Sequence, residues 1–315
     1  DGNVPFGTIT SIAESKFKIG QLVVGTDDGN IHVTKDSGST WIKISNALPQ
    51  NLWVSRVRFS NFNKDRIYVT LNGYRNDNFT TYAYVSEDLG STWKLLTQSF
   101  KLNAANVILE DSENENILYL GTDNGLFIST DKGLTWQDFS ADIPNVAVHD
   151  LVIQSREKDL IVATHGRSLY KVNIANIQQI NETINGKEMT LFQVEDVYFS
   201  ENWGNKSYTW GDDAVPSVAI WYYLKNISNI GITIKNKGGV VVFNRQAKAE
   251  KGMLKMDYDL SIDEKTKIAI EKKDVNMKIN QAANKKYYLP VGNYVVELET
   301  NGKKETQTLT IKERK

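Results

Sequence analysis

The sequence of 315 residues contains no cysteine and three histidines. Without cysteine it has no disulfide bonds, no thiolate metal ligands and no cysteine nucleophile. The three histidines are scattered and form no HExxH pattern, so we expect no bound metal, and we expect no cofactor because no phosphate-cradling glycine loop is present. No apolar run reaches the ~20 residues that a membrane-spanning helix needs, so we also expect no membrane span.

Charge of neither sign dominates the chain. The net charge is −1, and the lysines are scattered singly among acidic residues. Because no basic face is concentrated anywhere, we expect no nucleic-acid partner. Hydrophobic residues make up 40% and charged residues 24%, the ordinary balance of a globular protein, and the length suffices for two domains.

The N-terminal sequence DGNVPFGT has neither an initiator Met nor a charged-then-apolar signal segment. This start predicts a processed chain or a piece of a longer protein.

An internal repeat is the strongest pattern in the sequence. Three segments align without gaps, TKDSGSTW (34–41), SEDLGSTW (86–93) and STDKGLTW (129–136), and each fits S/T-x-D-x-G-x-T-W. The repeated aspartates lie 52 and 43 residues apart, which is the length of one four-stranded propeller blade. Alternating strands and Gly-containing turns flank each segment, as in LVVGTDDGNIHV and LYLGTDNGLFIS.

Each residue type in the repeat has a structural explanation. The carboxylate accepts backbone N–H groups across a tight turn, the glycine tolerates positive φ, and the tryptophan covers the joint between neighbouring sheets. Three catalytic acids in equivalent turns make no mechanistic sense, and each turn has too few oxygens for calcium. We therefore interpret these nine residues as architecture: Asp36, Gly38, Trp41, Asp88, Gly90, Trp93, Asp131, Gly133 and Trp136.

These segments resemble the Asp-box (bacterial neuraminidase, BNR) repeats shared by sialidases, sortilin-type receptors and xyloglucan-active glycoside hydrolases. Residues 1–175 resemble the C-terminal propeller blades of large exported bacterial proteins related to sortilin and often labelled glycosyl hydrolases. The resemblance implies a partial β-propeller of about four blades, the last, VHDLVIQSREKDLIVATHGRSLYKVNI, without a box. It also implies an exported location, whether periplasmic, cell-surface or extracellular. Because an open arc of blades leaves unpaired edges, we expect further blades upstream or pairing with another copy.

A second domain is predicted at residues 190–315, after a linker or short helix at 176–189. Strand-like runs occur there at sandwich spacing, with turns such as Lys237-Gly238-Gly239 between them. They resemble the immunoglobulin-like module that follows such propellers, and residues 262–286 fit no strand pattern and are interpreted as an insertion. The predicted fold class is thus all-β: a partial propeller plus a C-terminal immunoglobulin/fibronectin-like β-sandwich.

Ligand-binding candidates lie in the connections between the second and third strands of the blades. These connections fall at the end opposite the Asp boxes, where family members with a known cleft hold their ligands. The candidates are Arg75, Asp77, Asp123, His165 and Arg167. The competing interpretation is that Asp27 and Asp123 form turns and that Arg75, His165 and Arg167 pack or bond between blades. His149 with Asp150 resembles a histidine–carboxylate pair, but it starts a strand and is interpreted as structural.

No enzyme signature stands out, and we assign no catalytic residue. A sialidase needs an arginine triad, but no motif joins the arginines, and a glycoside hydrolase needs two facing carboxylates. The leading hypothesis is a non-catalytic binding or scaffolding module that recognises protein or glycan. The alternative is a glycoside hydrolase with its carboxylates on the face opposite the boxes. Five aromatic residues predict either a sugar-stacking platform or sandwich core: Trp203, Trp210, Trp221, Tyr222 and Tyr223.

Overall fold

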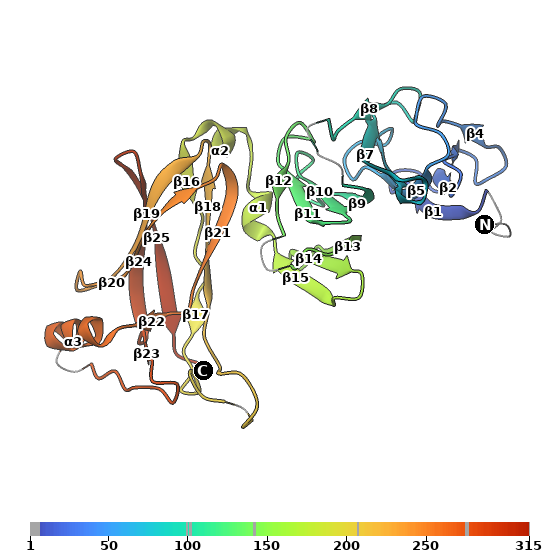
Figure 1. Ribbon diagram of the computed structural model, residues 1–315. Coiled ribbons are helices and arrows are strands. Elements are labelled where there is room, and N and C mark those ends of the chain that lie inside the picture. The colour runs from blue at the N-terminus through green and yellow to red at the C-terminus, as the bar shows by residue number, and fades with distance from the viewer. Residues whose placement is uncertain are drawn as a thin grey trace. The chain divides into compact units, whose positions relative to one another are not determined.

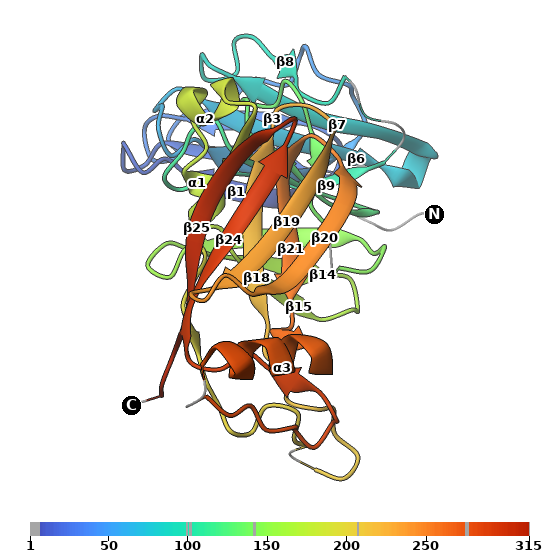
Figure 2. The same ribbon diagram turned by 90° about the vertical axis from the view of Figure 1, so that its left-hand side faces the viewer.

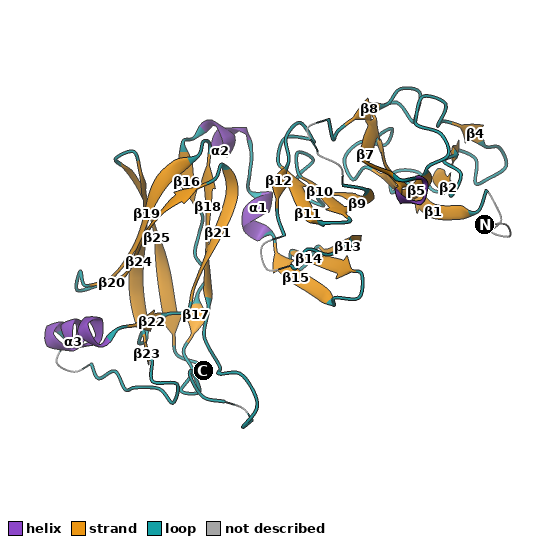
Figure 3. Ribbon diagram, in the orientation of Figure 1, coloured by secondary structure: helices purple, strands orange, loops and turns teal. Residues whose placement is uncertain are grey.

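The computed structural model describes residues 7–98, 100, 103–140, 143–206, 208–274 and 277–314. Strands dominate, and the helices are few and short (Figure 3). This confirms the predicted all-β class. The chain divides into two compact units, Asp1–Gln179 and Ile180–Lys315. Within the described ranges, none of the helices has the length and apolar character needed to cross a membrane.

Unit 1 consists of four antiparallel sheets that follow one another along the chain, which we call blades 1 to 4 (Figure 1). Blade 1 contains β1 (Ile9–Glu14), β2 (Leu22–Thr26), β3 (Ile31–Thr34) and β4 (Ile42–Lys43). Blade 2 contains β5 (Trp53–Phe59), β6 (Ile67–Gly73), the 3-10 helix η1 (Tyr74–Asn76), β7 (Asn78–Ser86) and β8 (Lys94–Leu95). Blade 3 contains β9 (Ala105–Glu110), β10 (Leu118–Thr122), β11 (Gly125–Ser129) and β12 (Gln137–Asp138). Blade 4 contains β13 (Val148–Gln154), β14 (Asp159–Thr164) and β15 (Leu169–Asn173).

Each blade is a meander in which consecutive strands pair, and this arrangement confirms the predicted partial β-propeller. The first strands of successive blades, β1, β5, β9 and β13, contact one another. Apolar side chains fill the space between blades: Val23 and Val33 of blade 1 pack with Val54 and Val69 of blade 2. Strands β6 and β10 are buried along their whole length, because each lies in a blade that has a neighbour on both sides.

The first strand of every blade has one β-bulge at the same place. The strand pairing leaves a single residue of the first strand without a partner on the second, and these residues are Thr10, Ser55, Asn106 and His149. In blades 1 and 2 the side chain of the bulge residue reaches the next blade. The hydroxyl of Thr10 donates to the Val54 carbonyl over 2.7 Å, and that of Ser55 donates to the Ala105 carbonyl over 2.9 Å.

The two ends of the blades are distinguished by two repeated backbone hydrogen bonds. At one end, which we call the Asp-box end, the box turn donates to the loop between the first and second strands: Ser37 N to Gly20 O, Leu89 N to Asp65 O and Lys132 N to Asn116 O. At the other, which we call the far end, the residue after the second strand donates to the residue before the first: Asp27 N to Thr8 O, Asp123 N to Ala104 O and His165 N to Ala147 O. Asp27, Asp123 and His165 therefore occupy equivalent positions in three blades.

Unit 2 contains two larger sheets. One is formed by β16 (Met189–Leu191), β18 (Val218–Leu224) and β21 (Gly252–Tyr258). The other is formed by β17 (Val197–Tyr198), β25 (Lys303–Lys312), β24 (Gly292–Thr300), β19 (Ser228–Asn236) and β20 (Val241–Ala249), in that order. Figure 2 shows β25, β24, β19 and β20 side by side in front of β18 and β21. The predicted hairpin around Gly238 and Gly239 is present as the turn between β19 and β20.

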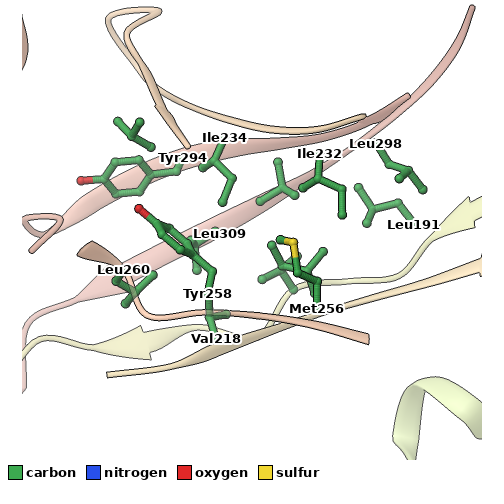
Figure 4. Packing of buried hydrophobic residues seen from close by; sticks show 14 of the residues in the cluster. Leu191, Val218, Ile232, Ile234, Met256, Tyr258, Leu260, Tyr294, Leu298 and Leu309 are labelled. Atoms are coloured by element: carbon green, nitrogen blue, oxygen red, sulfur yellow. The ribbon is translucent and has the colours of Figure 1, made fainter. Parts of the chain in front are cut away.

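The core of unit 2 lies between these two sheets (Figure 4). Ile232, Leu298 and Leu309 of the five-stranded sheet face Val218 and Met256 of the three-stranded sheet. The pattern of alternately buried residues in β24 is what a strand with one solvated face requires. The two sheets form a β-sandwich.

The α-helices of the described ranges lie in the two segments that lack a strand pattern. In the segment predicted as a linker or short helix lie α1 (Ala175–Gln178) and α2 (Glu182–Gly186). Residues 262–286 contain α3 (Glu264–Lys273), whose N-terminus is capped by Asp263 accepting from the Thr266 N–H over 2.7 Å. The short strands β22 (Ser261–Ile262) and β23 (Tyr287–Tyr288) pair across this segment.

Candidate functional site at the far end of the blades

The three Asp boxes share one hydrogen-bond pattern, which occupies their carboxylates. The Ser86 hydroxyl donates to Asp88 Oδ1 over 2.8 Å and accepts from the Gly90 N–H over 2.7 Å. Thr92 donates to Asp88 twice, through its N–H over 2.8 Å and its hydroxyl over 2.7 Å. The boxes of Asp36 and Asp131 repeat this set. Each carboxylate therefore closes its own turn.

The tryptophans of the boxes connect blades. The indole N–H of Trp93 donates to the Ile44 carbonyl over 2.8 Å, and that of Trp136 donates to the Leu96 carbonyl over 3.0 Å. Both hydrogen bonds join a blade to the preceding blade. Trp41 of blade 1 is 41% exposed, and its indole N–H finds no acceptor in the described part of the chain.

Arg75 lies at the far end, in the insertion between β6 and β7. Its guanidinium stacks 4.1 Å above the Trp53 ring, and its Nε donates to the Tyr74 hydroxyl over 3.3 Å. Asp77 ends η1 in the left-handed conformation, with φ of 53°. Arg75 and Asp77 are exposed, so the loop presents charges of both signs.

A relay of two buried amides connects this loop to Asp123. The Tyr74 N–H donates to Asn72 Oδ1 over 2.9 Å, Asn72 Nδ2 to Asn106 Oδ1 over 2.8 Å, and Asn106 Nδ2 to Asp123 Oδ1 over 2.9 Å. Buried amides that satisfy one another in this way fix the position of the groups at both ends of the relay. The relay thus connects the backbone at Tyr74, in the loop that carries Arg75 and Asp77, to Asp123 in blade 3.

His165 belongs to a second group, which sequence reasoning did not assemble. Its ring lies 5.2 Å from that of the bulge residue His149, centroid to centroid. The His149 carbonyl accepts from Arg56 Nη2 over 3.2 Å, and the neighbouring Asp150 carboxylate forms ion pairs with Arg56 at 3.0 Å and Arg58 at 3.3 Å. Blade 2 is therefore bridged to blade 4. We call this set the arginine–histidine cluster: Arg56, Arg58, His149, Asp150 and His165. Arg167, the remaining predicted residue, is exposed after Gly166.

The arginines of this cluster have spare donor capacity. The Nε atoms of Arg56 and Arg58 are buried, and no described residue accepts from them. Burial lowers the pKa of Arg58, and the charge of Arg56 lowers it further. The sequence could have indicated that Arg56 and Arg58 lie on the same face of β5, because residues i and i+2 of a strand share a face. Their partner Asp150 was not predictable, because it lies in a blade more than ninety residues away.

Two buried carboxyls lie at the Asp-box end. Glu110 is 3% exposed and accepts from Arg66 Nη1 over 3.0 Å and the Tyr68 hydroxyl over 2.8 Å. Burial raises the pKa of Asp111, although the Tyr119 hydroxyl and Gln178 both donate to it. These partners come from the blades themselves and from α1, which makes both carboxyls part of the framework. No group of three or more His, Asp or Glu suited to a metal ion occurs within the described ranges.

Comparison with known proteins gives a family. The family model described as "Sortilin, neurotensin receptor 3" (Sortilin-Vps10) matches residues 81–311, most of the chain. The chain belongs to the Sortilin-Vps10 family. No curated protein matches the sequence.

Solved structures resemble this Sortilin-Vps10 chain only loosely. The GH74 xyloglucanase from Xanthomonas campestris is 9% identical with a TM-score of 0.44, and the match covers 96% of this chain and 47% of that one. The Niastella koreensis GH74 enzyme is 11% identical with a TM-score of 0.45, over 97% of this chain and 66% of that one. YCF48 from Cyanidioschyzon merolae is 13% identical with a TM-score of 0.36, over 82% and 74%. The chain thus spans less than two thirds of the GH74 enzymes, and at these scores the likeness carries no argument about activity.

Proposed function

We propose that this chain is a non-catalytic binding and scaffolding module of a larger exported propeller protein, and that it recognises a protein or glycan at the far end of its blades. The amide relay from Tyr74 through Asn72 and Asn106 to Asp123 is the observation that carries this proposal. It holds an exposed loop of mixed charge in a fixed position, and preorganised polar groups on a rigid scaffold are what a recognition surface requires.

The groups at the far end suit binding better than hydrolysis. A glycoside hydrolase needs one carboxyl as acid and a second, free carboxylate about 5–10 Å away. Asp150 is engaged by two guanidinium groups, and Asp123 accepts from Asn106. The carboxyl whose pKa burial raises, Asp111, lies at the Asp-box end and is enclosed by its own partners. Arg75, Arg167 and His165 are by contrast exposed donors, which favours recognition of an acceptor-rich ligand.

The uncovered face of blade 1 supports the proposal that further blades complete the propeller. In blades 2 and 3 a Cβ on the box glycine would lie 2.6 Å from Ile44 or 3.0 Å from Leu96, side chains of the preceding blade. At Gly38, among the residues that the structure describes, it would meet only Trp41 of its own box. Blade 1 therefore has the surface that blades 2 and 3 use to contact a preceding blade.

We further propose that unit 2 is an immunoglobulin-like domain and that the protein is exported. The two facing antiparallel sheets and the β19–β20 hairpin support the first point. The match to a family described by the name of a receptor supports the second. Both would be tested on the full-length protein, by its experimental structure and by its location in fractionated cells.

The experiment for the binding function compares Arg75→Ala with Arg156→Ala. Both residues are exposed arginines, but Arg156 lies in the loop between β13 and β14, at the Asp-box end. The full chain would be immobilised and tested for binding to anionic polysaccharides and purified secreted proteins, which are acceptor-rich ligands. Sugar release from neutral and anionic polysaccharides would be measured in parallel. We expect Arg75→Ala to weaken binding at least tenfold, Arg156→Ala to leave it unchanged, and no polysaccharide to be hydrolysed. Turnover of any polysaccharide by the chain would refute the non-catalytic function, and equal binding by both variants would refute the site.

A further inference from the structure

Two exposed aromatic rings distinguish the loop between β17 and β18 in unit 2. Trp210 is 86% and Tyr208 65% exposed, and their rings stack with centroids 5.3 Å apart and planes 10° from parallel. The other aromatic residues of the predicted platform became core: Trp221, Tyr222 and Tyr223 are buried, and Trp203 packs against the sandwich interior. Because each large ring that stays in water forgoes the burial of about 150–250 Å², a stacked and exposed pair calls for an explanation.

This loop contains a short hairpin whose two arms pair through backbone hydrogen bonds. Gly204 N donates to the Ala214 carbonyl over 2.9 Å, and Ala214 N donates back to the Asn205 carbonyl over 2.8 Å. Closer to the tip, Lys206 and Asp213 form a β-bridge. The described backbone thus places the aromatic pair near the tip of a hairpin, at the end of unit 2 where residues 277–286 also run (Figure 1).

A cleft of about 390 Å³ opens at the base of this hairpin. Its aromatic wall is a row of three rings, in which Trp203 meets Phe199 edge-on at 5.0 Å and Tyr288 at 5.8 Å. This volume falls within the ~300–1,000 Å³ of typical small-ligand sites. Asn205, the first residue of the hairpin, lines the cleft, so the cleft and the exposed pair belong to one element.

Some polar groups of the cleft are engaged, since Ser200, Gln281 and Tyr288 make side-chain hydrogen bonds to neighbouring residues, but others are unused. The side chains of Glu201, Asn205 and Asn280 line it, and none of them has a hydrogen-bond partner among the residues that the structure describes. The indole N–H of Trp203 likewise has no acceptor there. An amide offers donors and an acceptor together, which is the complement of a hydroxyl group. The one negative charge of Glu201 is matched by Lys278, also on the lining, so the cleft favours neither anions nor cations.

We propose that this cleft and the Tyr208–Trp210 pair form a binding site for a neutral oligosaccharide. A sugar ring carries C–H groups on one face and hydroxyls around its edge. The C–H face packs on the negative face of an aromatic ring, and the hydroxyls pair with amides and an indole N–H. One sugar unit occupies the cleft beside Trp203, and another stacks on the outer face of Trp210. This site lies in unit 2, so it goes beyond the function proposed for the blades.

The test is affinity electrophoresis of the full chain through native gels that contain a soluble polysaccharide. Neutral probes are xyloglucan, mannan and β-glucan, and anionic probes are alginate and chondroitin sulfate. Trp210→Ala combined with Tyr208→Ala removes the platform, and Asn205→Ala combined with Asn280→Ala removes the amides. Tyr198→Ala is the matched control, because Tyr198 is also an exposed aromatic of unit 2, at 56%, but lies outside the cleft lining.

We expect at least one neutral polysaccharide to retard the chain, each double variant to weaken that binding at least tenfold, and Tyr198→Ala to leave it unchanged. Arg75→Ala, which removes the candidate residue of the blades, is also expected to leave it unchanged, which separates this site from the one proposed there. Circular dichroism and the unfolding midpoint verify that the variants fold. The proposal is overturned if no neutral polysaccharide retards the chain, if only anionic ones do, or if neither folded double variant loses binding.

Discussion

The indole N–H of Trp93 donates to the backbone carbonyl of Ile44, 2.8 Å away in the preceding blade. A side chain of one repeat thus satisfies a main-chain group of another. Gly90 of the same box lies so close to Ile44 that a Cβ would approach it to 2.6 Å. The Asp box therefore has two structural roles: its carboxylate closes the turn, and its tryptophan and glycine fit the turn against the preceding blade.

We predict that Trp93→Phe loosens the joint between blades 1 and 2. Phenylalanine retains much of the apolar contact but leaves the Ile44 carbonyl without its donor, which costs about 1–2 kcal/mol. Hydrogen–deuterium exchange with mass spectrometry would show faster exchange in β3, β4 and β7. Trp41→Phe is the matched control, because no described residue accepts from the Trp41 indole, and its effect should stay below about 0.5 kcal/mol. Equal effects of the two substitutions would contradict the role given to this bond.

The repeats made the blades predictable, but the positions of positive φ and of the β-bulges within them could not be predicted. The strands, the turns and the box glycines follow from local patterns of polarity and from Gly at fixed positions. However, the residue before each box glycine also has positive φ, including Leu89 at 56°. Nothing in its residue type indicates this, because hydrogen bonds of the turn hold the conformation: Leu89 N–H donates to the Asp65 carbonyl, and Gly90 N–H donates to the Ser86 hydroxyl. The bulges escape prediction for a similar reason, since Thr10, Ser55, Asn106 and His149 share no residue type.

The candidate site was predictable only in part. The position of Arg75 in a long connection was visible in the sequence, but the relay through Asn72 and Asn106 depends on the packing of two blades. In unit 2, Asp263 before α3 and Lys272 and Lys273 at its end are ordinary helix signals, and the alternation of the surrounding strands obscured them. Contacts between residues far apart in sequence, such as Arg58 with Asp150, arise from the fold and not from a motif.

We predict that Gly25→Ala is destabilising although its backbone lies in a regular strand. A Cβ at this position would lie 2.2 Å from Cγ1 of Val54 in blade 2, and such overpacking costs about 1–3 kcal/mol. Val54→Ala alone also destabilises the blades by opening a cavity, because Val54 is fully buried. The double variant should unfold at a higher denaturant concentration than the sum of the two single effects predicts. Additive effects in urea titrations would show that the two residues do not compete for one space.

Arg66 and Glu110 form a buried pair between blades 2 and 3, with side chains 8% and 2% exposed and 3.0 Å apart. Hydrogen bonds from Arg66 to Glu87 and Glu110 raise its pKa despite burial, so it remains charged. We expect Arg66→Met to lower the free energy of unfolding by about 3–5 kcal/mol, because it leaves the Glu110 charge buried without a cation. Adding Glu110→Gln should restore part of this loss. A double-mutant cycle from calorimetry measures the coupling, and a coupling near zero would rule out the pair as a structural unit.

The Asp boxes make the stability of unit 1 depend on pH in the acid range, and we predict that removing one hydroxyl changes this dependence. The pKa of Asp36 is lowered from 3.8 to about 2, chiefly because the Thr40 hydroxyl and N–H donate to the ionised carboxylate. Equivalent bonds from Thr92 lower the pKa of Asp88. A carboxyl whose pKa is lower in the folded state stabilises that state above its ordinary pKa, and this stabilisation disappears as the pH falls from about 4 to 2. Thr40→Val should raise the Asp36 pKa toward 3.8, as carboxyl NMR titration would measure, and should make the melting temperature depend less on pH in this window. Ser39→Ala removes a neighbouring hydroxyl that makes no bond to Asp36 and should change neither quantity. If Thr40→Val left the titration of Asp36 unchanged, the low pKa would have to come from a source other than the turn.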